Sequence, residues 1–138
     1  LAAEVTTHPG LAERDFGMWE GLTAEEIKAQ WPDAYAVWRT GHDPQGVEVE
    51  PRRAVGQRFS DAVRSLAATT GEGPLIVVAH GSAITQGTTA LLGMDASTWF
   101  GLRGLDNAHW ARLRSSHRDP GWELVDWNAG AAPTALLP

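Results

Sequence analysis

The pattern of apolar and polar residues along the chain contains one short run, residues 75–78, that is too hydrophobic to face water. The run is rich in β-branched residues and follows a Gly- and Pro-containing turn, which predicts a buried strand flanked by helices. A helical pattern begins directly after it and ends at Leu92 and Gly93. We therefore expect His80 at the carboxyl end of a strand and against the N-terminus of a helix, the edge of an α/β sheet where ligands bind.

Three further helices are predicted from apolar spacing and from end signals. Apolar residues three and four positions apart predict an amphipathic helix over residues 52–70. Thr23 and Glu26 have the spacing of a capping box, which predicts a helix over residues 24–30. A helix over residues 33–40 is expected to follow, after a proline.

The rest of the chain is predicted to be loops, one hairpin and one short helix. Residues 108–114 and 122–127 alternate between apolar and polar positions and predict an antiparallel hairpin. A short helix is expected over residues 96–100, capped by the preceding aspartate. Residues 11–22 read as an irregular loop anchored by large apolar side chains, and residues 41–51 as a lid or a substrate-specificity segment.

Composition narrows the class of protein and of partner. The 138 residues fit one domain, and 43% hydrophobic with 20% charged residues is typical of globular chains. A net charge of −6 argues against nucleic acid or an anionic membrane as a partner. The chain has no cysteine, which fits a cytoplasmic location, and no apolar run approaches the ~20 residues of a membrane span.

Two groups of residues are candidates for ligand binding or catalysis. The backbone amides of Gly81 and Ser82, at the start of a helix after His80, favour an anion such as phosphate. A structural histidine is the alternative for His80. The loop over residues 11–22 carries four further candidates, for which a solvated charge cluster is the alternative: Glu13, Arg14, Asp15 and Glu20. No spacing of acidic or histidine residues demands a metal.

Two motifs together resemble one known family. Residues 11–23, with the sequence LAERDFGMWEGLT, and residues 77–82, VVAHGS, are similar to motifs of the histidine phosphatase superfamily, which has the phosphoglycerate mutase-like fold. The closing residues 105–110 and 125–128 resemble an actinobacterial branch of that family. The resemblance implies a three-layer α/β/α fold, with residues 1–138 forming the C-terminal portion of a single domain.

The resemblance also implies roles for individual residues. Glu13 matches the carboxylate that donates a proton to the leaving oxygen and later helps to activate water. His80 matches the second active-site histidine, which binds phosphate and stabilises charge in the transition state. Gly81 and Ser82 match the residues whose amides contact phosphate. No metal and no cofactor is implied.

Three features depart from the family pattern. Glu50 and Arg58 have the spacing of a family loop glutamate and a following helix arginine, although the usual Gly-Glu-Ser is absent. Ala12 replaces a common arginine. The family nucleophile lies in an Arg-His-Gly at the end of the first strand, and this chain contains no such sequence. We therefore expect the N-terminal part of the fold, with that strand, to be absent from this chain.

Three explanations of the missing nucleophile stay open. The chain is the C-terminal part of a longer phosphatase, which we favour, or a second polypeptide supplies the first half, or a truncated relative only binds its ligand. The first two predict an exposed apolar sheet face or edge. A homodimer, or association with a chain that supplies the missing half, is compatible with these explanations.

The expected function is hydrolysis of a small phosphomonoester through a phosphohistidine intermediate, with a phosphoglycerate mutase less favoured. The alternative from another class is a catalytically incomplete phosphate- or anion-binding module. A serine hydrolase is disfavoured because its Gly-x-Ser-x-Gly motif is absent: His80 and Ile84 stand where glycines are required around Ser82.

Overall fold

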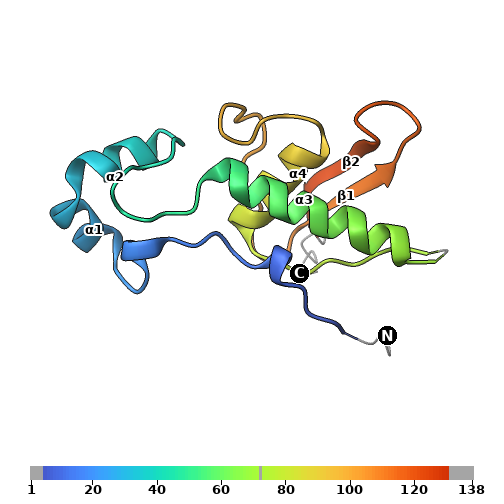
Figure 1. Ribbon diagram of the computed structural model, residues 1–138, viewed down its shortest axis with the longest axis horizontal. Coiled ribbons are helices and arrows are strands. Elements are labelled where there is room, and N and C mark those ends of the chain that lie inside the picture. Colours follow the sequence, from blue (N-terminus) through green and yellow to red (C-terminus); the bar gives the residue numbers. More distant parts are fainter. Residues whose placement is uncertain (1–4, 72, 131–138) are drawn as a thin grey trace, which may run out of the picture.

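The computed structural model describes residues 5–71 and 73–130, which form four α-helices and one two-stranded sheet (Figure 1). In chain order the elements are α1 (Ala24–Gln30), α2 (Pro32–Arg39), α3 (Arg52–Thr69), α4 (Gly81–Leu91), β1 (Trp110–Ser115) and β2 (Trp122–Ala129). Two short 3-10 turns precede them, η1 (Pro9–Leu11) and η2 (Gly17–Trp19). Among the described helices, none combines the length and the apolar character needed to cross a bilayer.

The helices begin and end close to the predicted positions. The capping box of α1 is confirmed, because the Thr23 side chain accepts a hydrogen bond from the Glu26 amide and the Glu26 side chain accepts one from the Thr23 amide. The helix predicted over residues 96–100 is wrong. Only a turn forms there, and Phe100 instead lies 4.8 Å from the Arg52 guanidinium.

The main core lies between α3 and α4. Its buried members are Val55, Phe59, Val63, Ala83 and Leu91. The two helices approach closely because α4 carries a glycine, Gly87, opposite Phe59: a Cβ at position 87 would lie 2.0 Å from the Phe59 ring. The hairpin closes one side of this core through Leu113 and Trp122.

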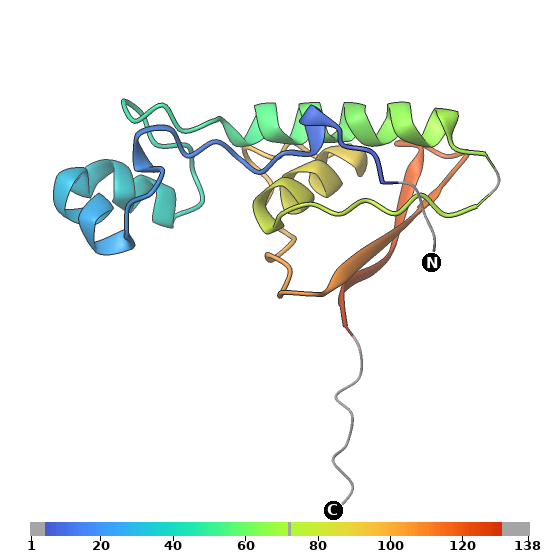
Figure 2. The same cartoon turned by 90° about the horizontal axis from the view of Figure 1, so that it is seen from below.

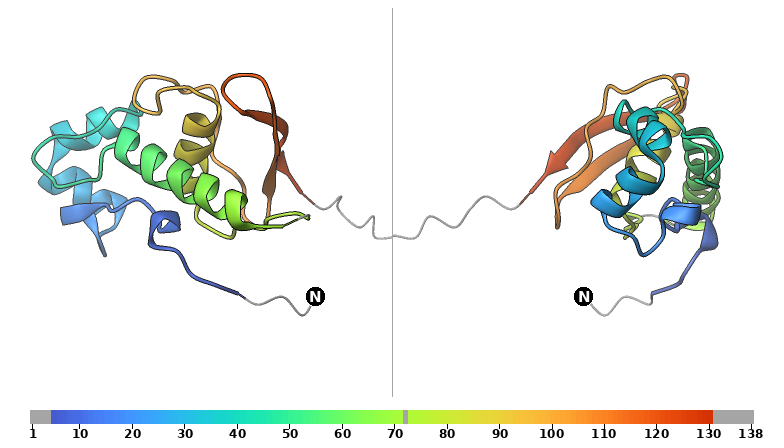
Figure 3. Two further views of the ribbon diagram at one scale, coloured as in Figure 1. Left: turned by 45° about the vertical axis from the view of Figure 1, so that its right-hand side comes forward. Right: turned by 90° about the vertical axis from the view of Figure 1, so that its left-hand side faces the viewer.

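A second, smaller core holds α1 and α2 at the other end of the molecule from the hairpin (Figure 3). Trp19 is only 3% exposed and packs with Val47 and Val49. Its ring meets that of Trp38 edge-on, with centroids 6.0 Å apart. The loop over residues 11–22 is therefore anchored by a buried aromatic side chain, as predicted.

The predicted hairpin is confirmed. β1 and β2 pair antiparallel, with Leu113 opposite Leu124 and Arg114 opposite Glu123. The Arg114 and Glu123 side chains also form an ion pair across the strands. In the described part of the chain these two strands make the whole sheet.

The strand predicted over residues 75–78 is not formed as expected. The stretch is extended but joins no β-ladder with the described residues, and Figure 2 shows it running between α3 and the hairpin. Val77 contacts the main core, whereas Ile76 is 71% and Val78 89% exposed. The prediction of burial was wrong because only one side of the stretch has a neighbour here. The described residues likewise do not form the wide sheet of a three-layer fold.

Replacing Gly87 by alanine should lower the free energy of unfolding by about 1–3 kcal/mol, measured by urea denaturation. The added methyl group must displace the Phe59 ring, and this cost exceeds the gain of up to about 1 kcal/mol from helix propensity. Gly81→Ala is the matched control because a Cβ at position 81 meets nothing within 4 Å. Equal stability of Gly87→Ala and wild type would contradict this account of the α3–α4 contact.

Candidate functional site

The carboxylate of Glu13 lies at the N-terminus of α4. Its Oε1 accepts a hydrogen bond of 2.8 Å from the Ala83 amide, and its Oε2 accepts one of 3.2 Å from the Ser82 amide. The first amides of a helix lack partners within the helix and carry partial positive charge. A side chain 69 residues away from Ser82 in sequence therefore supplies the cap of α4.

His80 is the residue directly before α4. Its backbone is extended, with φ −106° and ψ 160°, and its side chain makes no capping hydrogen bond to the helix. The residue is exposed. The structure thus brings Glu13, His80, Gly81 and Ser82 to the N-terminal end of one helix, and the amides at such an end are suited to an anion.

Arg58, on α3, fixes the backbone that carries Glu13. Its Nη1 donates to the carbonyl oxygens of Gly10 and Ala12 at 3.0 and 2.8 Å, and its Nη2 donates to the carbonyl oxygen of Glu13 at 2.9 Å. The same guanidinium forms a two-point ion pair with Glu50, at 2.7 and 2.8 Å. The two residues that the family resemblance connected are therefore in direct contact.

This ion pair shifts the pKa values of both partners. Hydrogen bonds from Arg58 lower the pKa of Glu50, and the Glu50 carboxylate raises the pKa of Arg58. Both groups consequently stay charged at neutral pH. The Arg58 guanidinium therefore stays available at neutral pH to donate hydrogen bonds to the carbonyl groups of Gly10, Ala12 and Glu13.

Arg14 is buried between two loops, which the sequence did not indicate. It is only 4% exposed, its Nε donates to the carbonyl oxygen of Glu50 at 2.7 Å, and its Nη2 pairs with Asp43 at 2.7 Å. Burial lowers the pKa of Arg14, and Asp43 opposes that change. Arg14 therefore ties the loop over residues 11–22 to the loop over residues 41–51. No pattern of neighbouring residues distinguishes such a buried arginine from a solvated one.

Two other candidates of the loop act locally. Asp15 Oδ1 accepts a hydrogen bond from the Gly17 amide at 2.7 Å, and Glu20 Oε1 accepts one from the Phe16 amide at 2.9 Å. Both hydrogen bonds stabilise turns within the loop over residues 11–22. Within residues 5–71 and 73–130, no three His, Asp or Glu side chains gather closely enough to hold a metal ion.

The comparisons with known proteins agree on one family. A model of the histidine phosphatase superfamily (branch 1) matches residues 1–130. The glucosyl-3-phosphoglycerate phosphatase of Mycolicibacterium vanbaalenii is 34% identical over 137 residues, and the match covers 88% of this chain and 61% of that protein. Phosphoserine phosphatase 1 of Hydrogenobacter thermophilus is 27% identical, with 83% and 54% covered. This chain thus spans about three fifths of the mycobacterial relative.

Solved structures give the same result. The mycobacterial glucosyl-3-phosphoglycerate phosphatase in complex with inorganic phosphate aligns with a TM-score of 0.73 and 32% identity, over 89% of this chain and 64% of that one. Its complex with VO3 aligns with a TM-score of 0.78 and 33% identity, over 94% and 65%. The expected likeness to an actinobacterial branch of the family is confirmed.

The Glu50–Arg58 pair should make stability depend on pH. Because the pKa of Glu50 is lowered on folding, the unfolded chain binds more protons on acidification, so this contribution is present above the unfolded pKa and is lost as the pH falls through the folded pKa. Between about pH 6 and about pH 3, wild type should lose more unfolding free energy than Glu50→Gln. The difference should stay below about 1 kcal/mol because the pair is partly exposed.

Urea denaturation at several pH values measures this difference. Glu25→Gln, an exposed change on α1, serves as the control and should follow the wild-type profile. Parallel profiles for Glu50→Gln and wild type would show that the Glu50 carboxylate is not held by Arg58 in solution.

Proposed function

The chain belongs to the histidine phosphatase superfamily, and we propose that it is the C-terminal part of a phosphatase that hydrolyses a small phosphomonoester through a phosphohistidine intermediate. The observation that carries this proposal is the position of the Glu13 carboxylate on the first amides of α4, next to His80. Membership of the superfamily supports a phosphatase activity.

In this proposal the end of α4 binds the phosphoryl group. His80 and the amides of Gly81 and Ser82 hold its oxygens, and positive potential at the helix N-terminus stabilises the charge that develops in the transition state. A phosphoryl oxygen and the Glu13 carboxylate would compete for the Ser82 amide. Substrate therefore releases the Glu13 side chain from its cap.

Released Glu13 is the proposed general acid and base. Its backbone stays in place because Arg58 holds the carbonyl group of Glu13, while its carboxyl group reaches the leaving oxygen and donates a proton. After the alcohol has left, the same carboxylate helps to activate water for hydrolysis of the phosphohistidine. No metal and no cofactor enters these steps.

The attacking imidazole comes from outside this chain. No Arg-His-Gly is present in the sequence, and the mycobacterial relative is longer than its match to this chain. We propose that the remaining part supplies the nucleophile and completes a three-layer α/β/α fold. Residues 1–138 alone would then show no turnover.

The substrate class follows from the same reasoning. The relatives are named as phosphatases of glucosyl-3-phosphoglycerate and of phosphoserine, both phosphomonoesters of a three-carbon acid. A small phosphomonoester is therefore the proposed substrate, and a mutase is less favoured. A cytoplasmic location and the absence of nucleic-acid or membrane partners stay predictions, as does the choice between a homodimer and association with a complementing chain.

A catalytically incomplete anion-binding module is the second candidate. It is favoured by the absence of an Arg-His-Gly from the sequence. In this candidate too, the bound anion has to displace the Glu13 carboxylate from the Ser82 amide. The two candidates differ in one result. Residues 1–138 preceded by a histidine phosphatase N-terminal segment should hydrolyse a phosphomonoester if the chain is part of an enzyme, and should only bind phosphate if it is a binding module.

In that extended protein, Glu13→Gln should lower kcat/KM for an alkyl phosphate by about 10²–10⁴-fold. For an aryl phosphate with an acidic phenol as the leaving group, the loss should be at least about tenfold smaller, because such an oxygen needs little protonation. The ratio kcat/KM is the measurement of choice because it reports the steps up to departure of the leaving group.

Glu20→Gln is the matched control, since Glu20 caps the Phe16 amide in the same loop and has no proposed role in catalysis. It should leave both substrates almost unaffected. Equal losses for the alkyl and aryl substrates in Glu13→Gln would argue against proton donation by Glu13.

A further inference from the structure

Gln86, on α4, is a buried polar residue whose amide group is only half paired. The residue is 2% exposed, and its Nε2 donates a hydrogen bond of 2.8 Å to the hydroxyl oxygen of Ser82. Its Oε1 is buried and accepts no hydrogen bond from the part of the chain that the structure describes. A buried amide oxygen without a donor costs more free energy than one hydrogen bond between neutral groups typically contributes. The stability of the fold therefore does not explain a glutamine at this position.

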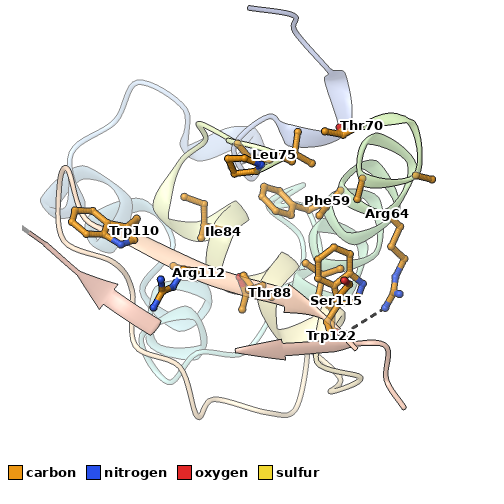
Figure 4. A pocket seen from close by; sticks show the side chains of 18 of the residues that line it. Phe59, Arg64, Thr70, Leu75, Ile84, Thr88, Trp110, Arg112, Ser115 and Trp122 are labelled. Atoms are coloured by element: carbon orange, nitrogen blue, oxygen red, sulfur yellow. Dashed lines mark hydrogen bonds between the residues drawn. The ribbon is translucent and has the colours of Figure 1, made fainter. Parts of the chain in front are cut away.

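Ser82 and Gln86 lie one turn apart on the same side of α4. On another side of the helix, Ile84 and Thr88 line a cavity between α3, α4 and the hairpin (Figure 4). Residues two positions apart in an α-helix are separated by about 200° around its axis, so Ser82 and Gln86 point away from that cavity. The Gln86 amide group instead lies beside the first turn of α4, where the Ser82 amide binds the Glu13 carboxylate.

The helix itself does not use the hydrogen of the Ser82 hydroxyl. Thr85 and Thr89 donate their hydroxyl hydrogens to carbonyl oxygens one turn earlier, those of Gly81 and Thr85. Ser82 is the second residue of α4, so no carbonyl group of the helix lies one turn before it. Because one lone pair of its oxygen faces Gln86 Nε2, the hydroxyl hydrogen must take another direction around the Cβ–Oγ bond. This hydrogen is thus available to a ligand at the end of the helix.

We propose that Gln86 is a positioning residue, which holds the Ser82 hydroxyl so that it donates a hydrogen bond to an oxygen of the bound phosphoryl group. The proposal rests on the phosphate site proposed at α4, but not on turnover. It adds one side-chain donor to the amides of Gly81 and Ser82. A hydrogen bond to a charged phosphate oxygen is roughly twice as strong as one between neutral groups. Gain in binding a ligand, at some loss of stability, then accounts for the unpaired Gln86 oxygen.

Titration calorimetry with inorganic phosphate tests the proposal, in residues 1–138 preceded by a histidine phosphatase N-terminal segment. Ser82→Ala removes the proposed donor and should weaken phosphate binding by about tenfold. Gln86→Met keeps the length of the side chain and removes both polar atoms, and it should weaken binding by about 3- to 10-fold. The urea midpoint of Gln86→Met should be no lower than that of wild type, because the unpaired oxygen is removed together with the hydrogen bond. A merely structural glutamine would give the opposite result, a lower midpoint with unchanged phosphate affinity.

A double-mutant cycle shows whether Gln86 acts through the hydroxyl group. In the Ser82→Ala background, Gln86→Met should have almost no further effect on phosphate affinity, because the group that it positions is gone. Thr89→Val is the matched control. Thr89 is also 2% exposed on α4, and its hydroxyl binds a carbonyl oxygen within the helix. Thr89→Val should therefore leave phosphate affinity unchanged in both backgrounds.

Two results would overturn the proposal while wild type binds phosphate. Gln86→Met could bind phosphate as tightly as wild type, or it could weaken binding equally with and without the Ser82 hydroxyl. Hydrolysis of a phosphomonoester is recorded separately in the same samples. The expected phosphate affinities without hydrolysis would contradict the proposed turnover alone, and hydrolysis with no effect of Gln86→Met on phosphate affinity would contradict this proposal alone. A wild type that binds no phosphate would contradict both.

Discussion

The position of Glu13 depends on one guanidinium group. Arg58 projects from α3 and binds the carbonyl groups of Gly10, Ala12 and Glu13, while the Glu50 carboxylate binds the same guanidinium at two points. Five donor contacts in a fixed planar geometry leave this stretch of backbone little freedom. Lysine has the charge but not the geometry, so it could not serve all of these acceptors at once. A residue of α3 thus fixes the backbone that places the Glu13 carboxylate at the N-terminus of α4.

The elements that the sequence predicted well are those decided by neighbouring residues. The capping box of α1, the amphipathic pattern of α3 and the alternation in the hairpin are local signals, and each appears in the structure. The close contact of Phe59 with Gly87 was not predictable, because it joins two helices whose facing positions no local pattern reveals. The same holds for Arg14, whose burial results from two loops meeting.

In the candidate site, too, only some features could be predicted from the sequence. Its residues could be listed from two motifs, and the structure places the Glu13 carboxylate of the first motif on the amides of the helix that begins in the second. The actual partners of Glu13 were not foreseen: the carboxylate binds the Ser82 amide, which was assigned to phosphate, and the Ala83 amide, which was not. Residues 75–78 were misjudged for a related reason. Burial of a strand depends on what lies beside it, and one run of apolar residues carries no information about that neighbour.

The loop over residues 41–51 was expected to be a lid or a substrate-specificity segment. In the structure Val47 and Val49 pack with Trp19 in the second core, and Asp43 is paired with the buried Arg14. Such a loop is part of the framework. Insertions there would have to break a packed core, whereas exchange of single side chains at its exposed positions, such as Gln45 and Glu48, would not. Evolution of selectivity through this loop should therefore proceed by point substitution at constant length.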